Sequence, residues 1–342
     1  MNIIQEQDIR AFADSFELSD NLDDAKFLIT GASGLIGSTL VHCLLAIDKK
    51  VQILAPVRNA QKCRSLFSQK ELSSIKIIEC DLKTIEYSSF GKVDYIVHCA
   101  APTSSKYFIE CPLETFDIII NCTVHLLEYA KANPVKGFVS LSSLEVYGIQ
   151  PDDTLPVIES CQFYLDPLSI RSSYPMAKRA SEHLCYLYAK EYGLPVKIAR
   201  LTQTTGAGIA KDDNRVMAQF ARLVSQGQNI VLHTSGEASR PICYVTDAVS
   251  GILYVLLKGS DGEAYNISND NTYMSIRQIA EYLRDNFNTD IKVLVEENGS
   301  KNYGYAPETK LRLSSAKLVE LGWRPNYGLK EIFERLIAYL SE

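Results

Sequence analysis

The sequence predicts an α/β protein in which a doubly wound parallel sheet is followed by a smaller lobe of mixed α/β structure. Two observations lead to this prediction. From residue 26 to about residue 202, short apolar runs of strand length alternate with segments of helical periodicity. A glycine-rich turn follows the first of these strands and opens the first helix. Beyond residue 202 the alternation weakens, which indicates a change of architecture.

The alternating region contains six predicted strands. Each is a short run rich in valine, isoleucine and leucine, and it is too short to be a typical helix. The helices are longer and carry apolar residues at helical spacing. The predicted strands are 26–30, 51–57, 75–81, 93–101, 135–143 and 196–202, and the predicted helices are 33–47 and 112–132.

The two flanking regions differ from this pattern. Residues 1–25 form a predicted N-terminal helical extension, because Ile9, Phe12, Ala13 and Phe16 recur at helical spacing and indicate a face packed on the body. Residues 202–342 form the smaller lobe, although some of its elements can return to the region 26–201. Its predicted helices are 213–228, 275–287 and 329–340, and its predicted strand is 264–268.

The composition excludes several classes of function. The chain has 342 residues, 46% of them hydrophobic, and a net charge of −6 without any basic stripe, which argues against nucleic-acid binding. Its apolar runs are too short to span a membrane. Nine cysteines without a CxxC pair indicate reduced thiols and a cytoplasmic protein. Five scattered histidines without ligand spacing give no reason to expect a metal.

The glycine-rich turn "TGASGLIG" is a candidate phosphate-binding loop. Gly31 permits the tight turn, Gly34 lets the backbone approach a diphosphate, and Gly37 allows the helix to pack closely on the strand. The helix that follows offers free N–H groups and the positive end of its dipole. The strand–turn–helix context supports the interpretation that the turn binds a dinucleotide.

The end of the second strand leaves the choice of dinucleotide open. An acid usually stands there and accepts hydrogen bonds from the ribose 2′-hydroxyl of NAD, but this chain has Ala55 and Pro56 in "VQILAPVRN". Arg58 follows closely, and an arginine can pair with the 2′-phosphate of NADP. NADP is therefore not excluded. Alternatively, Arg58 is a solvated loop charge.

Tyr174 and Lys178 in "SSYPMAKR" form a candidate catalytic pair. Their spacing of four places both side chains on one face of a helix. A nearby ammonium favours the phenolate, so we expect Lys178 to lower the pKa of Tyr174 and make it a base for a substrate hydroxyl. Ser143 stands at the carboxyl end of the preceding strand, in "SLSSLEVYG", where its hydroxyl can hydrogen-bond the reacting oxygen.

In order along the chain, "TGASGLIG", "HCAAP", "SSLEVYG", "YPMAK" and "LGWRP" resemble the motifs of extended short-chain dehydrogenase/reductases, the NAD-dependent epimerase/dehydratase family. The resemblance covers roughly residues 26–340. It implies a Rossmann dinucleotide-binding domain over 26–201 and a nucleotide-sugar-binding lobe over 202–342. It also implies transient oxidation of a nucleotide-diphosphate sugar at C4, with NAD as the usual cofactor, Tyr174 as base, and Lys178 holding the cofactor ribose.

The resemblance also assigns binding residues. The cofactor residues that it implies lie in the glycine turn, at the ends of the strands and on the Tyr/Lys helix. They are Gly31, Ser33, Gly34, Leu35, Ile36, Gly37, Arg58, Asp81, Leu82, Ala100, Ala101, Tyr174 and Lys178. The substrate residues that it implies are Thr103, Ser104, Ser105, Gln203, Arg215 and Arg240, the two arginines being candidates for the substrate diphosphate.

Glu145 narrows the choice within the family, as a fourth candidate catalytic residue beside Ser143, Tyr174 and Lys178. "SSLEVYG" looks like the TSEVYG of UDP-glucuronate decarboxylases and the TDEVYG of nucleotide-sugar 4,6-dehydratases. Leu144 stands where the dehydratases have their acid, which argues against dehydration. The alternative for Glu145 is an acid that only holds a loop.

Several functions remain open at this point. The leading interpretation is an enzyme that oxidises a nucleotide sugar at C4 and then epimerises or otherwise modifies it. The first alternative is decarboxylation of a nucleotide hexuronate. Others are an NADPH-dependent reductase of a sugar ketone, and a cofactor-sensing regulator that is not an enzyme. The family also implies a homodimer that pairs the apolar segments 112–132 and 172–193.

Overall fold

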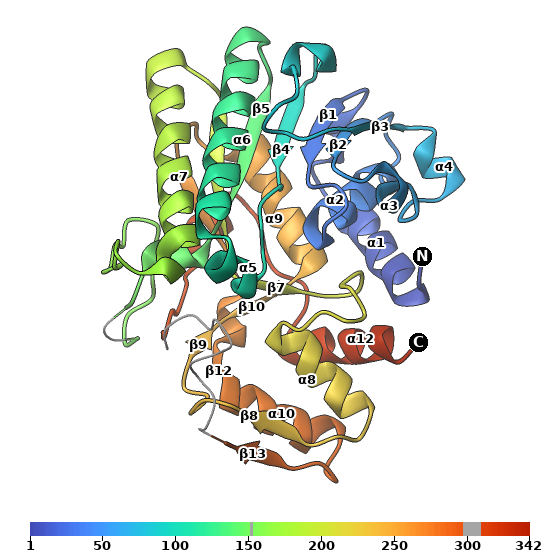
Figure 1. The fold of residues 1–342 in the computed structure, drawn as a ribbon. Coiled ribbons are helices and arrows are strands. Elements are labelled where there is room, and N and C mark those ends of the chain that lie inside the picture. Colours follow the sequence, from blue (N-terminus) through green and yellow to red (C-terminus); the bar gives the residue numbers. More distant parts are fainter. Residues whose placement is uncertain (151–152, 297–308) are drawn as a thin grey trace.

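The computed structural model describes residues 1–150, 153–296 and 309–342. Seven parallel strands form one sheet in the order β11-β6-β5-β4-β1-β2-β3, which confirms the predicted α/β class (Figure 1). The strands are β1 (Lys26–Thr30), β2 (Gln52–Val57), β3 (Ile75–Glu79), β4 (Tyr95–His98), β5 (Gly137–Ser143), β6 (Val196–Leu201) and β11 (Ala264–Ile267).

The order of the strands reverses between β1 and β4. From β1 the chain proceeds to β2 and β3 on one side of the sheet, and from β4 it proceeds to β5 and β6 on the other. Thr30 pairs with His98 where β1 and β4 end. Ligands of open α/β sheets bind outside the carboxyl ends of the strands at such a switch point. The topology therefore directs the search for the site to this edge.

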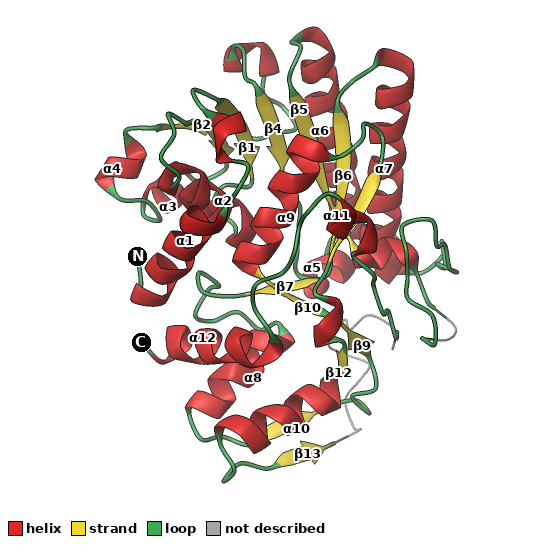
Figure 2. Ribbon diagram, turned by 180° about the vertical axis from the view of Figure 1, so that it is seen from behind, coloured by secondary structure: helices red, strands yellow, loops and turns green. Residues whose placement is uncertain are grey.

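Helices cover both faces of the sheet. The helices α6 (Pro112–Ala132) and α7 (Ser173–Tyr192) lie on one face, and α2 (Leu35–Ala46) and α9 (Val245–Lys258) lie on the other (Figure 2). Alternate residues of β1 feed the two cores: Phe27 packs on the α2/α9 side and Leu28 on the α6/α7 side. Shorter helices complete the layers: α3 (Ala60–Arg64), α4 (Gln69–Leu72), α5 (Ser105–Glu110) and α11 (Ala316–Glu320).

The smaller lobe has its own core, built by three amphipathic helices and three short two-stranded sheets. Its helices are α8 (Val216–Ser225), α10 (Ile276–Phe287) and α12 (Leu329–Ser341). Its strand pairs are β7 (Gln203–Thr205) with β10 (Ile242–Tyr244), β8 (Ile230–Leu232) with β13 (Val293–Val295), and β9 (Ser239–Arg240) with β12 (Met274–Ser275). Three described elements within 202–342 return to the large sheet: β11 joins it as a strand, and α9 and α11 pack against it.

Helix α9 is the main element that the sequence pattern did not reveal. Its residues Ile252, Leu253, Val255 and Leu256 are all buried, because it packs on the sheet and also on α2. A helix covered on most sides loses the polar face that produces a clear helical period. Among the described residues, no helix is both long enough and apolar enough to cross a membrane.

The N-terminal extension forms the predicted helix, α1 (Ile3–Ser15). Phe12 stacks on Phe16 with ring centroids 5.0 Å apart, and Phe16 meets the edge of Tyr254 on α9. On another side, Asp8 of α1 accepts hydrogen bonds from Tyr244 of β10 and from Arg335 of α12. The extension therefore packs against both lobes, and the two chain termini lie side by side (Figure 1).

Candidate active site

The glycine turn lies against the end of β4. Gly31 has φ +70°, and a Cβ on it would lie 2.8 Å from the backbone nitrogen of Ala100. A Cβ on Gly37 would lie 2.2 Å from the carbonyl oxygen of Gly31. Gly34 precedes α2 and has no side chain to cap it, so the first N–H groups of the helix, from Leu35 onward, are available to an anion. The shape of the turn fits the diphosphate of a dinucleotide.

A buried hydrogen-bond chain joins the turn to β4. The Thr30 hydroxyl lies 2.7 Å from His98 Nδ1 and accepts a bond from the backbone N–H of Ala100. Burial, and then the charge of Lys178, lower the pKa of His98 to about 3, so this histidine is neutral near pH 7. These contacts fix the segment around Ala100 beside the turn. Ala101 packs with Tyr174 and Phe108 in a small apolar cluster.

The residues expected at the adenosine end differ in exposure. Arg58 follows β2 and is exposed, close enough to influence Tyr107 and Cys122 electrostatically. Asp81 follows β3 and is also exposed, and its Oδ1 accepts a 2.9 Å hydrogen bond from the backbone of Lys83. Asp81 therefore stabilises a turn whatever else it binds. Leu82 is buried.

The structure brings Ser143, Tyr174 and Lys178 together at the carboxyl end of β5. Ser143 ends the strand, and its hydroxyl is close enough to Tyr174 to lower the pKa of the phenol. Tyr174 and Lys178 share one face of α7, with Lys178 Nζ 6.0 Å from the centroid of the Tyr174 ring. Both side chains are buried, at 9% and 5% exposure. The ring of Phe108 stacks on Tyr174 at 4.3 Å and 10°.

The pKa of Tyr174 differs from the sequence prediction. Burial raises it above its usual value, and the negative charge of Glu145 raises it further, against smaller opposing effects of Ser143 and Arg171. The prediction that Lys178 lowers it is wrong for this arrangement. Lys178 Nζ instead donates a 2.7 Å hydrogen bond to the carbonyl oxygen of Leu141. Burial also lowers the pKa of Lys178 to about 8, so the ammonium is still mostly charged at pH 7 and loses its charge as the pH rises above about 8.

Glu145 has a partner that the sequence analysis missed. Arg171, in the short 3₁₀ helix Ile170–Ser172 before α7, holds Glu145 by two bonds, Nη1–Oε2 at 2.9 Å and Nη2–Oε1 at 3.0 Å. Glu145 itself lies in the 3₁₀ helix Leu144–Tyr147 that follows β5. The available signal was the position of Arg171, three residues before Tyr174 in "RSSY".

The residues expected to bind substrate are distributed over both lobes. Gln203 on β7 and Arg240 on β9 each have a buried polar atom, Oε1 and Nε respectively, without a hydrogen-bond partner among the described residues. Such atoms need an explanation, and a polar ligand provides one. Glu145 and Arg171 both influence the pKa of Arg240, which burial lowers. Arg240 therefore belongs to the same electrostatic cluster as the catalytic candidates.

The remaining expected substrate residues have other roles in the structure. Arg215 is exposed at the start of α8 and pairs with Asp213 at 3.0 Å. Ser104 caps α5 by accepting the N–H of Tyr107, while Thr103 is exposed and Ser105 is half-buried. Within the described ranges, none of these residues forms a hydrogen bond or ion pair with Tyr174. Their binding roles stay predictions.

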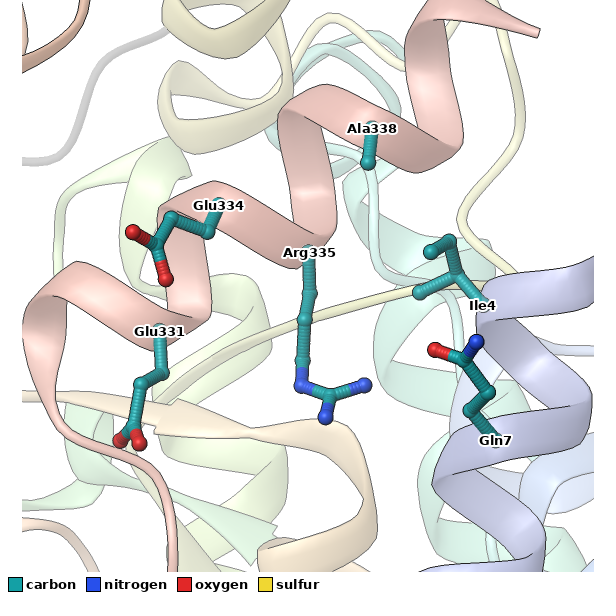
Figure 3. A pocket seen from close by; sticks show the side chains of 6 residues that line it. All are labelled: Ile4, Gln7, Glu331, Glu334, Arg335 and Ala338. Carbon is teal, nitrogen blue, oxygen red and sulfur yellow. The ribbon is translucent and has the colours of Figure 1, made fainter.

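A separate cavity of about 330 Å³ lies between α1 and α12 (Figure 3). None of the predicted site residues lines it. Figure 3 shows the Arg335 side chain pointing into the space between the two helices. The residues that line this cavity are Ile4, Gln7, Glu331, Glu334, Arg335 and Ala338.

In the part of the chain that the structure describes, no group of three or more His, Cys, Asp or Glu residues is placed to hold a metal ion.

Comparisons with known proteins agree with this arrangement. The model of the NAD dependent epimerase/dehydratase family matches residues 27–268. UDP-glucuronic acid decarboxylase 6 of Arabidopsis thaliana is 29% identical over 308 residues, which is 90% of this chain and 86% of the relative. UDP-glucuronic acid decarboxylase 1 of Xenopus tropicalis is 28% identical, over 94% of this chain and 73% of the relative.

The fold matches solved structures over nearly its whole length. UDP-glucuronic acid 4-epimerase from Bacillus cereus, in complex with UDP-glucuronic acid and NAD, superposes with a TM-score of 0.78. It is 23% identical, and the match covers 92% of this chain and 98% of that one. An epimerase from Methanothermobacter thermautotrophicus has a TM-score of 0.79 at 20% identity, covering 99% and 96%. At these identities the likeness concerns the fold.

Proposed function

Because the chain belongs to the NAD-dependent epimerase/dehydratase family, we propose that it oxidises a nucleotide-linked sugar at C4, with Tyr174 as base, and then epimerises or otherwise modifies it. The observation that carries the proposal is the grouping of Ser143, Tyr174 and Lys178 at the carboxyl end of β5. The glycine turn follows β1 and lies against the end of β4, the strand next to β5 in the same sheet. The candidate dinucleotide-binding turn and the proposed base, Tyr174, therefore lie at the same edge of the sheet.

The roles of the side chains follow from their contacts. The Ser143 hydroxyl is close enough to Tyr174 to lower the pKa of the phenol, so a sugar hydroxyl placed between the two can bond both. Tyr174 then takes the proton from that hydroxyl, and Ser143 orients the oxygen. A nicotinamide dinucleotide held by the glycine turn and Lys178 would supply the hydride acceptor for that carbon. Lys178, on the face of α7 that carries Tyr174, is available to the cofactor ribose.

The residues present fit a dinucleotide of either kind. The turn at Gly31 leaves no room for a Cβ, and α2 begins without a side-chain cap, as a diphosphate site requires. No acid stands at the end of β2, and the exposed Arg58 is available to a 2′-phosphate. We take NAD as the family's usual cofactor and keep NADP as the alternative.

Decarboxylation of a nucleotide hexuronate is the second candidate. It is favoured by Glu145 beside Tyr174, by Leu144 in place of the dehydratase acid, and by relatives that are named UDP-glucuronic acid decarboxylases. Oxidation at C4 makes the C5 carboxylate part of a β-keto acid. The C5–carboxylate bond then breaks to release carbon dioxide, and the electron pair left at C5 is protonated before the ketone is reduced again.

The direct test is mass spectrometry of the purified protein, denatured to release its cofactor, and of its reactions with UDP-glucose, UDP-N-acetylglucosamine and UDP-glucuronic acid. An isomer of unchanged mass establishes an epimerase. Loss of carbon dioxide from UDP-glucuronic acid establishes the decarboxylase. Stoichiometric consumption of added NADPH would instead identify a net reductase. Absence of any conversion would contradict the proposal and favour the cofactor-sensing regulator.

We also propose which ligand each lobe binds. We assign dinucleotide binding to residues 26–201 and nucleotide-sugar binding to residues 202–342, while β11 of the latter joins the large sheet and α9 packs on it. The nine cysteines are free thiols, which fits a cytoplasmic location.

We also infer a homodimer that pairs α6 and α7 with their copies. Both helices expose large apolar side chains, which soluble proteins seldom leave in groups without a partner. Light scattering coupled to gel filtration tests the dimer, and a monomer at micromolar concentration would contradict it. The exposed residues are Leu113 and Phe116 on α6, and Tyr186, Leu187 and Tyr192 on α7.

A further inference from the structure

Arg171 touches several members of the active site at once. Both terminal guanidinium nitrogens of Arg171 bond the carboxylate of Glu145. The side chain of Arg171 is 12% exposed and that of Glu145 is 22% exposed. Its guanidinium lies 5.1 Å from the centroid of the Phe108 ring, which in turn stacks on Tyr174. Two-point pairing fixes the guanidinium and the carboxylate relative to each other. Arg171 therefore holds a negative charge in place beside the proposed base.

The charges that face Tyr174 come from three elements. Glu145 approaches from the segment after β5, Arg171 from the segment before α7, and Lys178 from α7 itself, while the Ser143 hydroxyl of β5 lowers the pKa of Tyr174. Glu145 raises the pKa of Tyr174 and Arg171 lowers it. The two charges oppose each other at the phenol. The buried Arg240 of β9 faces the same pair, because Glu145 raises its pKa and Arg171 lowers it. Removing Arg171 or Glu145 therefore changes the balance of charge at the phenol in a largely dry site, with Arg240 as the remaining cation beside the pair.

Another buried pair in this protein shows what a purely structural arginine looks like. Arg200 on β6 holds Glu182 through Nε and Nη2, and its Nη1 donates to Tyr147 and to the carbonyl oxygen of Glu159. Arg171 is less completely bonded: its Nε is buried without a partner within the described residues. Anchoring a loop does not account for an arginine left in this state next to Tyr174.

We propose that Arg171 is a positioning residue of the active site, which neutralises the Glu145 carboxylate beside Tyr174 and thereby sets the pH range in which Tyr174 accepts a proton. The proposal rests on the proposed function, because it takes Tyr174 as the base. It does not depend on whether the sugar is epimerised or decarboxylated. It adds a residue that acts through another residue and needs no contact with substrate.

The test compares the pH dependence of kcat in variants of the full-length protein, with the UDP-sugar that the wild type converts. Arg171→Met should move the midpoint of the acid limb upward by about one pH unit or more, since an unpaired Glu145 disfavours the phenolate. Glu145→Gln should move the midpoint downward, whatever its effect on kcat itself. The double variant should return the midpoint toward the wild-type value. Arg171→Lys should lie close to the wild type, because it keeps the charge.

Lys330→Met is the matched control, because Lys330 forms an exposed pair with Glu334 and its loss should shift nothing. A wild-type midpoint in Arg171→Met, or a double variant that fails to reverse the shift, overturns the proposal. If Arg171→Met does not fold, because the buried carboxylate has lost its partner, Glu145→Gln and the double variant still decide the matter.

A second measurement separates this proposal from the proposed function. The phenolate absorbance of Tyr174 is obtained with NAD⁺ present, as the difference between each protein and its Tyr174→Phe counterpart. Glu145→Gln should titrate at lower pH than the wild type, and identical curves overturn the role of the pair. If the wild type converts no nucleotide sugar, the proposed function fails, while the titration of Glu145→Gln and of Arg171→Met, which should titrate at higher pH than the wild type, still tests the pair.

Discussion

Two buried clusters in this protein contain the same kinds of side chain but differ in how their polar groups are hydrogen-bonded. One joins Asp8, Arg335 and Tyr244 at the meeting point of α1, α12 and β10. The other joins Glu145, Arg171 and Tyr174 at the end of β5. Each contains a carboxylate, an arginine and a tyrosine.

The hydrogen bonds of the two clusters are arranged differently. Tyr244 donates its hydroxyl directly to Asp8, Arg335 donates to the other carboxylate oxygen, and Asp8 is only 2% exposed. Among the described residues, the carboxylate of Glu145 is instead held by Arg171, without a hydrogen bond from Tyr174. Near it, Nε of Arg171 and Nε of Arg240 are buried without partners among the described residues.

The difference distinguishes a structural cluster, called a brace below, from a cluster that belongs to an active site. A polar cluster that satisfies its own members contributes to stability and fixes the relative position of the elements it joins. A cluster that keeps buried donors unpaired costs stability unless a ligand completes it. We therefore interpret the Asp8 cluster as a brace for the N-terminal extension, and the Glu145 cluster as part of the active site. Three predictions test this distinction, beginning with the largest expected effect.

Tyr174→Phe should lower kcat by about 10²–10⁴-fold, because it removes the proposed proton acceptor. Its cofactor content as purified should stay at the wild-type level. The measurement is steady-state conversion of the UDP-sugar found in the mass-spectrometric panel. Tyr244→Phe is the matched control, since it removes a hydroxyl from the brace: it should lower the free energy of unfolding while kcat per folded molecule remains. Normal turnover in Tyr174→Phe would remove the basis of the proposed function.

Asp8→Asn should change how stability depends on pH. Burial raises the pKa of Asp8 to about 6, from an ordinary value of 3.8. The folded state therefore binds this proton more tightly than the unfolded state does, and the contribution to stability is greatest below pH 3.8. It is lost as the pH rises to about 6, and amounts to about 3 kcal/mol.

The check is chemical denaturation of the wild type and of Asp8→Asn at several pH values between about 3.5 and 7. The free energy of unfolding should fall more steeply with pH in the wild type than in the variant. Parallel curves would show that Asp8 does not carry a raised pKa. A large loss of kcat per folded molecule in Asp8→Asn would break the distinction between brace and site.

Ser143→Ala should lower kcat by about tenfold, which corresponds to one hydrogen bond to the reacting oxygen of about 1.4 kcal/mol. The variant should also lose about 1 kcal/mol of stability, because the Ser143 hydroxyl caps the following 3₁₀ helix through the N–H of Glu145. Kinetics and denaturation on the same preparation separate the two effects. A loss of stability with unchanged kcat would make Ser143 a cap only.

Much of the fold was predictable because its signals are local. The strands of the large sheet are short apolar runs, and the helix 112–132 was predicted with the bounds that α6 has. Helix α9 was harder to recognise because burial on most sides removes the polar face from its pattern. The short strands of the smaller lobe, such as β9 with two residues, are too brief to produce any periodicity.

The candidate site likewise contains features that local sequence spacing predicted and features that only the folded structure revealed. The sequence by itself determined the glycine turn, the Tyr174–Lys178 face and the strand-end serine, because each depends on spacing within a few residues. Only the tertiary structure decided the partner of Glu145 and the pKa of Tyr174. Arg171 lies 26 residues from Glu145 in the chain, and no local spacing connects them. The pKa depends on burial and on the sum of charges from separate elements, which exist as a set only after the chain has folded.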